Sequence, residues 1–268
     1  MCDTCGCNIT PGNRDSQGGK LAVDVLKGLL SDNDYQAQHN REHFDKYQVL
    51  ALNLMSSPGS GKTRLLEATI DALKDEVNIA VIEGDLETEN DAERIRKQGV
   101  PAVQIQTGSA CHLDAHMVHD AVHGLKLSDL DIVFIENVGN LVCPASFDLG
   151  QHLNVTLLSV TEGDDKPSKY PVMFRAADLM LLTKTDLLDV LDDFDPDKAE
   201  HNLRQLASVA PVYNLSARRG DGLSTWMNWL KQQYQAQVER IKKGESLKPA
   251  IQPDGVQFHN PVQNQVQG

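Results

Sequence analysis

The sequence predicts an α/β protein in which helices cover both faces of a mainly parallel sheet. From residue 49 onward, apolar segments of strand length alternate with segments of helical periodicity, which is typical of repeated βα units. The first apolar segment runs directly into a turn rich in Gly, Ser and Pro, and a helical segment follows. The length of 268 residues suits one large α/β domain with appendages.

Each segment of the chain has a predicted structure. Strands are expected at residues 49–55, 77–83, 102–107, 131–136, 155–161, 179–182 and 212–215. Helices are expected at residues 21–47, 62–73, 89–98, 196–207 and 223–241, and a further helix is expected to begin at residues 111–116. Because the carboxyl ends of parallel strands meet at one edge of the sheet, ligands are expected to bind there.

Composition argues against several classes of protein. The net charge of −13 argues against a nucleic-acid partner held by bulk electrostatics. No apolar run reaches membrane-spanning length, and the N-terminus lacks the basic and apolar regions of a secretory signal. We therefore expect a soluble cytoplasmic protein, in which the five cysteines are metal-binding or reactive rather than disulfide-bonded.

The turn after the first predicted strand has the strand–loop–helix context of a phosphate-binding loop. Gly59, Ser60 and Gly61 form this turn, where glycine lets backbone N–H groups approach phosphates closely. Lys62 is placed to reach the β- and γ-phosphates of a nucleotide, and the Thr63 hydroxyl is placed to ligate Mg²⁺. The predicted fold is therefore that of a P-loop NTPase.

Two carboxylates at the ends of predicted strands are candidate catalytic groups alongside Lys62. Asp85 is a candidate to hold Mg²⁺ directly or through water, or to position the attacking water. Glu136, with Gly139 close behind it, is a candidate sensor of the γ-phosphate. Together they predict a nucleotide-hydrolysing switch.

The segment Thr-Lys-Thr-Asp at residues 183–186 resembles the guanine-recognition motif Asn-Lys-x-Asp. The Asp186 carboxylate would accept hydrogen bonds from guanine N1–H and the exocyclic amine, a donor pair that adenine lacks. Lys184 would pack along the base, and Ser216 and Ala217 follow the last predicted strand, where such a loop backs the base. We therefore expect GTP and GDP as ligands.

Three N-terminal thiols form a first candidate metal site. Cys2, Cys5 and Cys7 lie within six residues, and Gly6 permits a tight reversal of the chain. With the α-amine as a fourth ligand, this set suits Zn²⁺, Cu(I) or square-planar Ni²⁺.

A second candidate site joins Cys111 and His112 to Cys143, a thiolate and imidazole set that suits Zn²⁺ or Ni²⁺. His112 begins a series of histidines at intervals of 4, 3 and 4 residues that would share one helical face: His116, His119 and His123. His39 and His43 lie four residues apart in an earlier helix and are expected to be solvated surface residues.

Taken together, these motifs resemble the HypB family, the GTPases of hydrogenase nickel incorporation. The resemblance rests on Cys-x-x-Cys-Gly-Cys at the N-terminus, Ser-Ser-Pro-Gly-Ser-Gly-Lys-Thr, Glu-Gly-Asp, Cys-His-Leu-Asp-Ala-His, the run at residues 136–150, and Ser-Val-Thr-Glu-Gly-Asp-Asp-Lys-Pro. It spans residues 49–230 and the first seven residues. The run at residues 136–150 is its most specific part.

The resemblance implies a GTPase that helps to load nickel into the large subunit of nickel–iron hydrogenase. It implies a GTP-dependent homodimer that works with a metallochaperone of the HypA type. It makes Cys2, Cys5 and Cys7 a high-affinity nickel site. It makes the second cysteine and histidine group a weaker site at the subunit interface, with His116 as an additional ligand. Lys169 resembles a lysine that reaches the nucleotide of the partner subunit.

Four parts of the chain are expected. Residues 1–20 form a flexible metal-binding segment, residues 21–47 a helical region, residues 48–243 the GTPase domain, and residues 244–268 a disordered tail. Ser56 and Thr183 depart from the usual Gly and Asn of their motifs, which leaves a metal-buffering protein with a degenerate nucleotide site as an alternative. A nickel GTPase serving urease is the other alternative.

Overall fold

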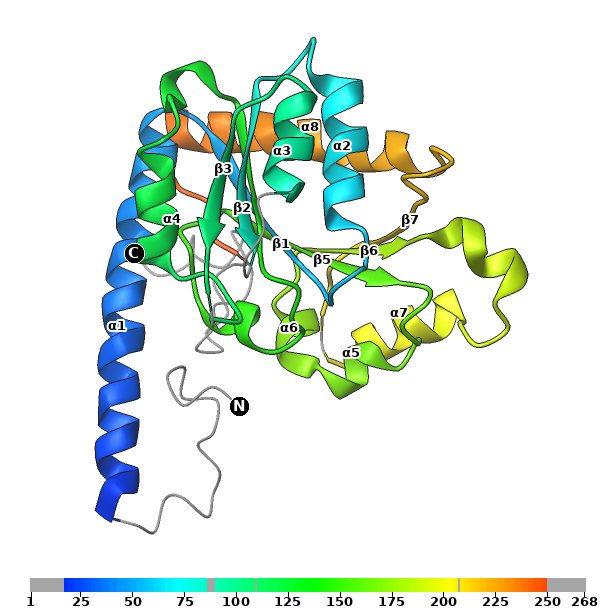
Figure 1. The fold of residues 1–268 in the computed structure, drawn as a ribbon, viewed down its shortest axis with the longest axis horizontal. Coiled ribbons are helices and arrows are strands. Elements are labelled where there is room, and N and C mark those ends of the chain that lie inside the picture. The colour runs from blue at the N-terminus through cyan, green and yellow to red at the C-terminus, as the bar shows by residue number, and fades with distance from the viewer. Residues whose placement is uncertain (1–16, 86–89, 109, 207, 250–268) are drawn as a thin grey trace, which may run out of the picture.

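Seven strands form one sheet in the order β3-β2-β4-β1-β5-β6-β7 (Figure 1). The computed structural model describes residues 17–85, 90–108, 110–206 and 208–249. The strands are β1 (Leu50–Met55), β2 (Ile79–Asp85), β3 (Ala102–Gln106), β4 (Ile132–Glu136), β5 (Leu153–Ser159), β6 (Leu179–Thr183) and β7 (Val212–Asn214). Every neighbouring pair is parallel, so the predicted fold class and the seven predicted strands are confirmed.

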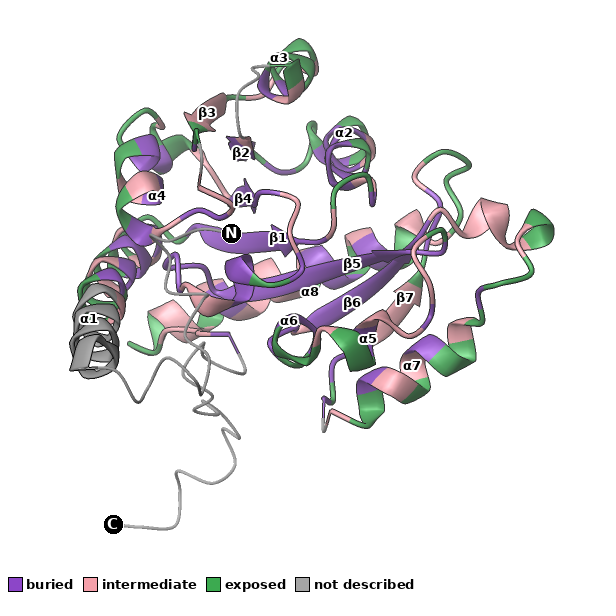
Figure 2. Ribbon diagram, turned by 60° about the horizontal axis from the view of Figure 1, so that its bottom comes forward, coloured by how far each residue is buried: buried purple, intermediate pink, exposed green. Residues whose placement is uncertain are grey.

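Burial follows the position of each strand in the sheet (Figure 2). The central strands β1, β4, β5 and β6 are buried along their whole length, as their nearly continuous apolar sequences require when helices cover both faces. The edge strands β3 and β7 are only partly buried. Because β1 lies in the middle of the sheet, the phosphate-binding loop that follows it is central too.

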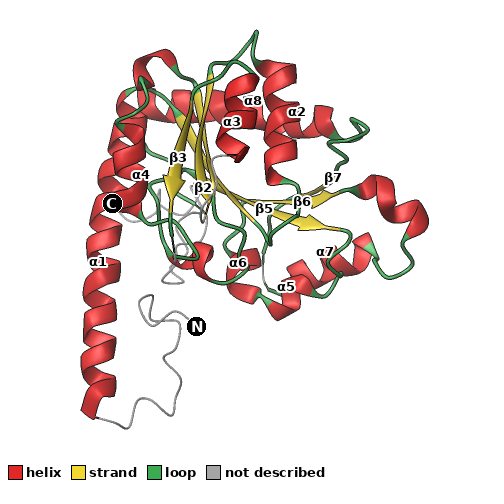
Figure 3. Ribbon diagram, in the orientation of Figure 1, coloured by secondary structure: helices red, strands yellow, loops and turns green. Residues whose placement is uncertain are grey.

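One face of the sheet is covered by α2 (Lys62–Leu73), α3 (Asn90–Lys97) and α8 (Leu223–Lys242) (Figure 3). Apolar side chains of α2 and α8 interlock with the strands in the largest hydrophobic cluster. The fully buried Trp226 also donates its indole N–H to Thr69 Oγ1 at 2.8 Å. This contact satisfies the polar atom of a large core residue.

The opposite face carries two groups of helices. The long helix α1 (Gln17–Lys46) and α4 (Ala115–Val122) pack beside β2 and β4, whereas α5 (Lys166–Lys169), α6 (Pro171–Arg175) and α7 (Pro196–Arg204) cover β5 and β6. Short 3₁₀ segments complete the described part of the fold: η2 (Leu127–Asp129), η3 (Cys143–Ser146) and η4 (Thr185–Val190).

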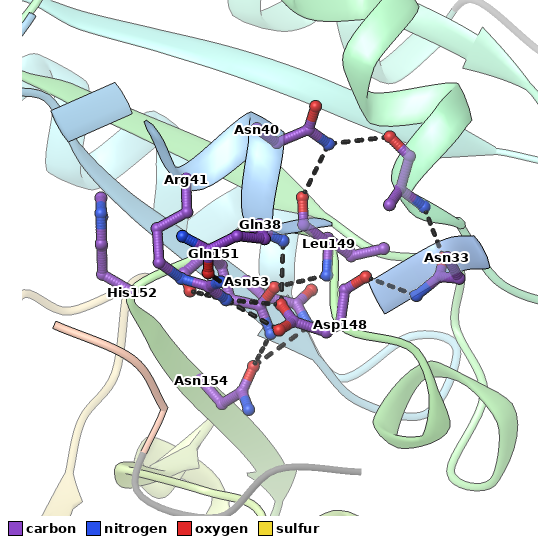
Figure 4. Close-up of polar contacts among 12 residues, drawn as sticks. Asn33, Gln38, Asn40, Arg41, Asn53, Asp148, Leu149, Gln151, His152 and Asn154 are labelled. Atoms are coloured by element: carbon purple, nitrogen blue, oxygen red, sulfur yellow. Dashed lines mark hydrogen bonds and ion pairs between the residues drawn. The ribbon is translucent and has the colours of Figure 1, made fainter. Parts of the chain in front are cut away.

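A buried polar network anchors α1 to the segment between β4 and β5 (Figure 4). The Arg41 guanidinium donates to both carboxylate oxygens of Asp148, at 2.7 and 2.8 Å. The Asn40 amide donates to the carbonyl oxygens of Ala115 and Leu149, at 2.8 and 3.1 Å. Asn40 is fully buried and Arg41 is almost fully buried. We name this group of contacts the α1 anchor.

Some predictions fall outside this description. Cys2, Cys5 and Cys7 lie outside the described residues, as does most of the expected C-terminal tail. Among the helices of the described ranges, none has the length and apolar character needed to cross a membrane.

Candidate functional site

The phosphate-binding loop brings three of the predicted residues together. Thr63 Oγ1 donates to Glu136 Oε1 at 3.1 Å, and Lys62 Nζ lies 4.0 Å from the same oxygen. Lys62 Nζ also donates to Ser56 Oγ at 3.0 Å. Ser56, the departure from the usual glycine, thus holds the lysine across the loop.

Glu83 is a further acidic residue of this site, and the sequence reading did not single it out. Burial, and then the neighbouring Glu136, raise the pKa of Glu83 to about 10. Burial also raises the pKa of Glu136, against the influence of Lys62. The signal that could have identified Glu83 is a carboxyl group within the apolar strand β2, because acidic side chains are almost never fully buried unless they have a partner.

These two carboxyl groups fit a divalent cation. Glu83 Oε1 and Glu136 Oε2 are buried and accept no hydrogen bond within the described part of the chain. Buried oxygens without partners are costly, and carboxylate and hydroxyl oxygens are the ligands that Mg²⁺ uses. The Thr63 hydroxyl and Asp85 line the same cavity of about 400 Å³.

A second cavity, of about 430 Å³, adjoins the first and shares Gly61 and Arg64 with it. It is lined by residues of the predicted base motif, namely Lys184, Asp186 and Ala217. Ser216 Oγ donates to Asp186 Oδ1 at 2.7 Å, which fixes the carboxylate that would read the base. Ser216 is fully buried, and it orients Asp186 from behind.

Thr183 has a defined position in this structure. Its hydroxyl donates to the Ser60 carbonyl oxygen at 2.7 Å, and Lys184 Nζ donates to the Gly59 carbonyl oxygen at the same distance. The base motif is therefore tied directly to the phosphate-binding loop, although Thr183 replaces the usual Asn.

The internal cysteines and His112 meet as the sequence predicted. The Sγ atoms of Cys111 and Cys143 lie 3.1 Å apart, and Cys111 Sγ lies 3.8 Å from His112 Nδ1. One ligand atom from each of the three residues lies within 4.8 Å of those of the other two. The His112 ring stacks on Phe147 with centroids 4.0 Å apart, and burial lowers its pKa, which favours the neutral imidazole that binds metals.

The predicted helix at residues 111–116 begins later than expected. Asp114 is its N-cap and accepts from the Met117 N–H at 2.8 Å, so α4 starts at Ala115. Cys111 and His112 lie in the preceding loop, and the prediction that His112 shares a helical face with the later histidines is wrong. This loop is what allows His112 to turn toward Cys143.

The remaining predicted residues have different surroundings. His116 is exposed, its Nε2 lies 3.1 Å from Asp32 Oδ2, and it is not part of the cluster of Cys111, His112 and Cys143. Lys169 is exposed and pairs with Asp165 at 2.6 Å. Its expected role toward a partner's nucleotide stays a prediction.

One segment joins the cluster of Cys111, His112 and Cys143 to the phosphate-binding loop. The Asn140 N–H donates to the Ser56 carbonyl oxygen at 2.8 Å, and its side-chain amide donates to the Cys111 carbonyl oxygen at 3.2 Å. A Cβ atom on Gly139 would lie 2.8 Å from Pro58, so only glycine permits this close approach. Movement of residues 136–140 would therefore be felt at both sites.

The chain is similar to known proteins over most of its length. The family described as "CobW/HypB/UreG, nucleotide-binding domain" matches residues 50–214. The hydrogenase maturation factor HypB of Escherichia coli K12 is 53% identical over 218 residues, which cover 81% of this chain and 74% of that protein. The chain belongs to the HypB family. The phosphate cavity lies wholly within the range that this nucleotide-binding domain model matches.

Solved HypB structures agree with the fold. HypB from Helicobacter pylori, crystallised in complex with nickel, is 43% identical, with a TM-score of 0.73 over 76% of this chain and 96% of that chain. HypB from Archaeoglobus fulgidus is 39% identical, with a TM-score of 0.72 over 76% of this chain and 100% of that chain. A further relative, from Helicobacter hepaticus, is a hydrogenase/urease maturation factor and is 43% identical over 80% of this chain and 88% of that protein.

Proposed function

We propose that this protein is a nickel-binding GTPase that delivers nickel to the large subunit of nickel–iron hydrogenase during maturation. Its HypB relatives, which are hydrogenase maturation factors, support the hydrogenase role. The observation that carries the proposal is that residues 136–143 supply Glu136 to the phosphate cavity and Cys143 to the metal cluster. Nucleotide state and metal binding would then be linked through one short segment.

The base cavity supports guanine as the ligand. Asp186, oriented by Ser216, would accept from the two adjacent donors of guanine, and Lys184 would cover the face of the base. Adenine would leave the Asp186 carboxylate without these partners, which costs binding free energy.

The phosphate cavity supports slow hydrolysis. Thr63 and Asp85, with Glu83 and Glu136 beside them, would hold Mg²⁺, which neutralises charge that develops on the phosphate oxygens. Lys62 would leave Ser56 and bind the β- and γ-phosphates. Glu136 would give up the Thr63 hydroxyl as the nucleotide binds and so report its presence to the segment behind it.

The cluster of Cys111, His112 and Cys143 would bind nickel as cargo, or Zn²⁺ in its place. Three ligands leave a position open for a second subunit of a GTP-dependent homodimer to contribute sulfur. A HypA-type metallochaperone and the hydrogenase large subunit are the expected partners in transfer. Cys2, Cys5 and Cys7 would hold a separate nickel ion.

Base preference tests the nucleotide assignment. GTP turnover should exceed ATP turnover, and Asp186→Asn should lose GTP but accept xanthosine triphosphate, because xanthine carries a carbonyl where guanine carries its amine. Equal turnover of ATP and GTP by the unaltered protein would reject a guanine site and favour a degenerate one.

Metal affinity tests the linkage. Using the full chain with Cys2, Cys5 and Cys7 changed to Ser, Ni²⁺ affinity should differ between GDP and a non-hydrolysable GTP analogue, and dimer mass should change with it. By reciprocity, nickel must then shift nucleotide affinity by the same factor. Cys143→Ala should remove both effects. Transfer to apo-urease in preference to the apo-hydrogenase large subunit would favour the urease alternative.

A further inference from the structure

Four histidines meet where α1 packs against α4. Two come from α1, one comes from α4, and one is the C-cap residue directly after α4; the members of each pair are four residues apart: His39, His43, His119 and His123. Ring centroids lie 4.5 Å apart for His39 and His43 and 4.5 Å apart for His119 and His123. The sequence predicted His39 and His43 as simple surface residues. It did not predict their contact with His119 and His123, because this contact depends on how two distant segments pack.

The contacts between the two pairs are somewhat longer. The His119 centroid lies 5.1 Å from that of His39 and 5.7 Å from that of His43, and the His43 centroid lies 6.3 Å from that of His123. On a tetrahedral ion with metal–nitrogen bonds of about 2 Å, imidazole nitrogens lie about 3.3 Å apart and ring centres about 5 Å apart. The Nε2 atoms of His119 and His123 are already 3.1 Å apart.

The α1 anchor sets the tautomer of His119. The Asn40 side-chain nitrogen faces two backbone carbonyl oxygens, which can only accept, so the Asn40 Oδ1 atom must face His119. Oδ1 lies 3.0 Å from His119 Nδ1 and accepts a hydrogen bond from its N–H. In the neutral ring, Nε2 then carries a lone pair, and it points toward His123. Fixing one ring nitrogen by a hydrogen bond so that the other can bind metal is the arrangement seen around metal-ligating histidines.

The cluster is open to ions. His39 and His123 are exposed, whereas His43 and His119 are half-buried. Burial and the neighbouring imidazoles lower the pKa of His43 and of His119, so these rings resist protonation. Neutral imidazole is the form that ligates a metal.

We propose that His39, His43, His119 and His123 form a second metal site, which binds one Zn²⁺ or Ni²⁺ ion and clamps α1 to α4. Among the described residues, only Cys111, His112 and Cys143 already hold their ligand atoms within 4.8 Å of one another, so the four imidazoles close on the ion by side-chain rotation. Rotation about the last side-chain torsion of histidine has a broad, shallow profile, and the exposed members are free to turn.

This site is separate from the cysteine cluster but lies on connected elements. It holds α1, whose anchor contacts Asp148 and Leu149, in the same segment between β4 and β5 that carries Cys143. An ion at the four histidines would thus stiffen the support of this segment without contacting the nucleotide.

The test uses the full chain with all five cysteines replaced by Ser, which removes the thiolate sites and leaves the imidazoles. Titration with Zn²⁺ and with Ni²⁺ should show one ion per chain, and the ion should raise the melting temperature. Replacing one ligand from each helix, His39→Ala with His119→Ala, should weaken binding by more than about 100-fold and remove the thermal shift, because two of four ligands are lost.

The control replaces an exposed histidine outside the cluster, His201→Ala, and should leave binding unchanged. Circular dichroism and melting without metal show whether each variant folds. If His119→Ala fails to fold, the pair His39→Ala with His123→Ala gives the same test at exposed positions. Equal weakening in the cluster and control variants, or no ion bound by the cysteine-free protein, would overturn the proposal.

Discussion

The nucleotide site and the α1 anchor both bury carboxyl groups, but the oxygens of these groups have opposite surroundings in the two regions. In the anchor, the Asp148 carboxylate accepts from Arg41 at 2.7 and 2.8 Å and from the Gly150 N–H at 2.9 Å. In the nucleotide site, Glu83 and Glu136 each keep a buried oxygen with no partner among the described residues, and the pKa of each is raised.

This difference separates the scaffold from the binding site. When the partners of a buried charge all belong to the fold, their contacts stabilise the fold. Removing one partner leaves the other charge buried and unpaired, which carries a large desolvation cost. A buried group without a partner weakens the empty protein and gains its partner when a ligand arrives. Substitutions in the two regions should therefore affect different measurements.

The largest effect is expected for Lys62→Ala. In the empty protein Lys62 donates to Ser56 of the phosphate-binding loop and lies 4.0 Å from Glu136 Oε1, and in the proposed function it binds the nucleotide phosphates. Loss of one such charged group should lower GTP turnover by at least about 100-fold. The free energy of unfolding should change by less than about 1 kcal/mol. The neighbouring carboxyl groups of Glu83 and Glu136 have raised pKa values, so without Lys62 they hold a proton and leave no unpaired buried charge. Large destabilisation with retained turnover would remove the distinction between the two regions.

Asp148→Ala should do the reverse. It leaves the Arg41 guanidinium buried without its carboxylate and should destabilise the protein by about 3–5 kcal/mol. Turnover measured well below the melting temperature should remain within about twofold, since Asp148 is outside both cavities. Urea unfolding and GTP hydrolysis measure the two quantities. The double variant Arg41→Met with Asp148→Leu serves as the control and should recover part of the stability.

Sequence alone identified the nucleotide site more fully than the anchor, and there is a physical reason for this. Lys62, Thr63 and Asp186 belong to short motifs whose chemistry depends on local spacing. The anchor joins Arg41 to Asp148, 107 residues away, and no local pattern encodes such a contact. The four histidines went unrecognised for the same reason.

The errors within the sites were local. The sequence did not predict Glu83 as a site residue, because its apolar neighbours indicated only a strand. Its place in the site depends on the pairing of β2 with β4, which sets Glu136 directly opposite Glu83. The helix after Cys111 was started too early because histidine spacing outweighed the capping residue Asp114. The sequence correctly placed Cys111 and His112 near Cys143, since both segments follow the carboxyl ends of strands in the same parallel sheet.

Gly150→Ala is expected to have the next largest effect on the anchor. Gly150 has φ +90, and a Cβ atom there would lie 2.5 Å from Asn40 Cβ and 2.6 Å from the Ala37 carbonyl oxygen. Strain and overlap together should cost about 2–3 kcal/mol and loosen α1. Gly59→Ala is the matched control, because φ is +76 but no atom lies within 4 Å of the added Cβ. It should cost about 1 kcal/mol in stability and reduce nucleotide binding instead. Similar stability losses in both variants would show that backbone strain, and not the approach of α1, determines the cost.

The smallest expected effect is a difference in the pH dependence of stability. His152 is fully buried beside the anchor, its Nδ1 accepts from the Ala51 N–H at 2.9 Å, and its Nε2 lies 3.1 Å from Asp45. Burial lowers the pKa of His152, against the influence of Asp45. The unfolded chain therefore takes up the proton more readily, and this residue's contribution to stability falls as the pH drops below about 6.5.

Glu83 should have the opposite sign. Its pKa is raised to about 10 in the folded protein without nucleotide, so the unfolded chain loses the proton first, and its contribution to stability falls as the pH rises above 4.5. Each group contributes at most about 1.4 kcal/mol per pH unit inside its window. Lowering the pH from 7 to 5.5 should thus reduce the contribution of His152 to stability and increase the contribution of Glu83. Urea unfolding across this range should become less acid-sensitive in His152→Gln, which keeps a donor and an acceptor but does not titrate. It should become more acid-sensitive in Glu83→Gln, because the stabilising effect of acid is lost. If both variants shifted the slope in the same direction, the two regions would not differ in how they bury their charges.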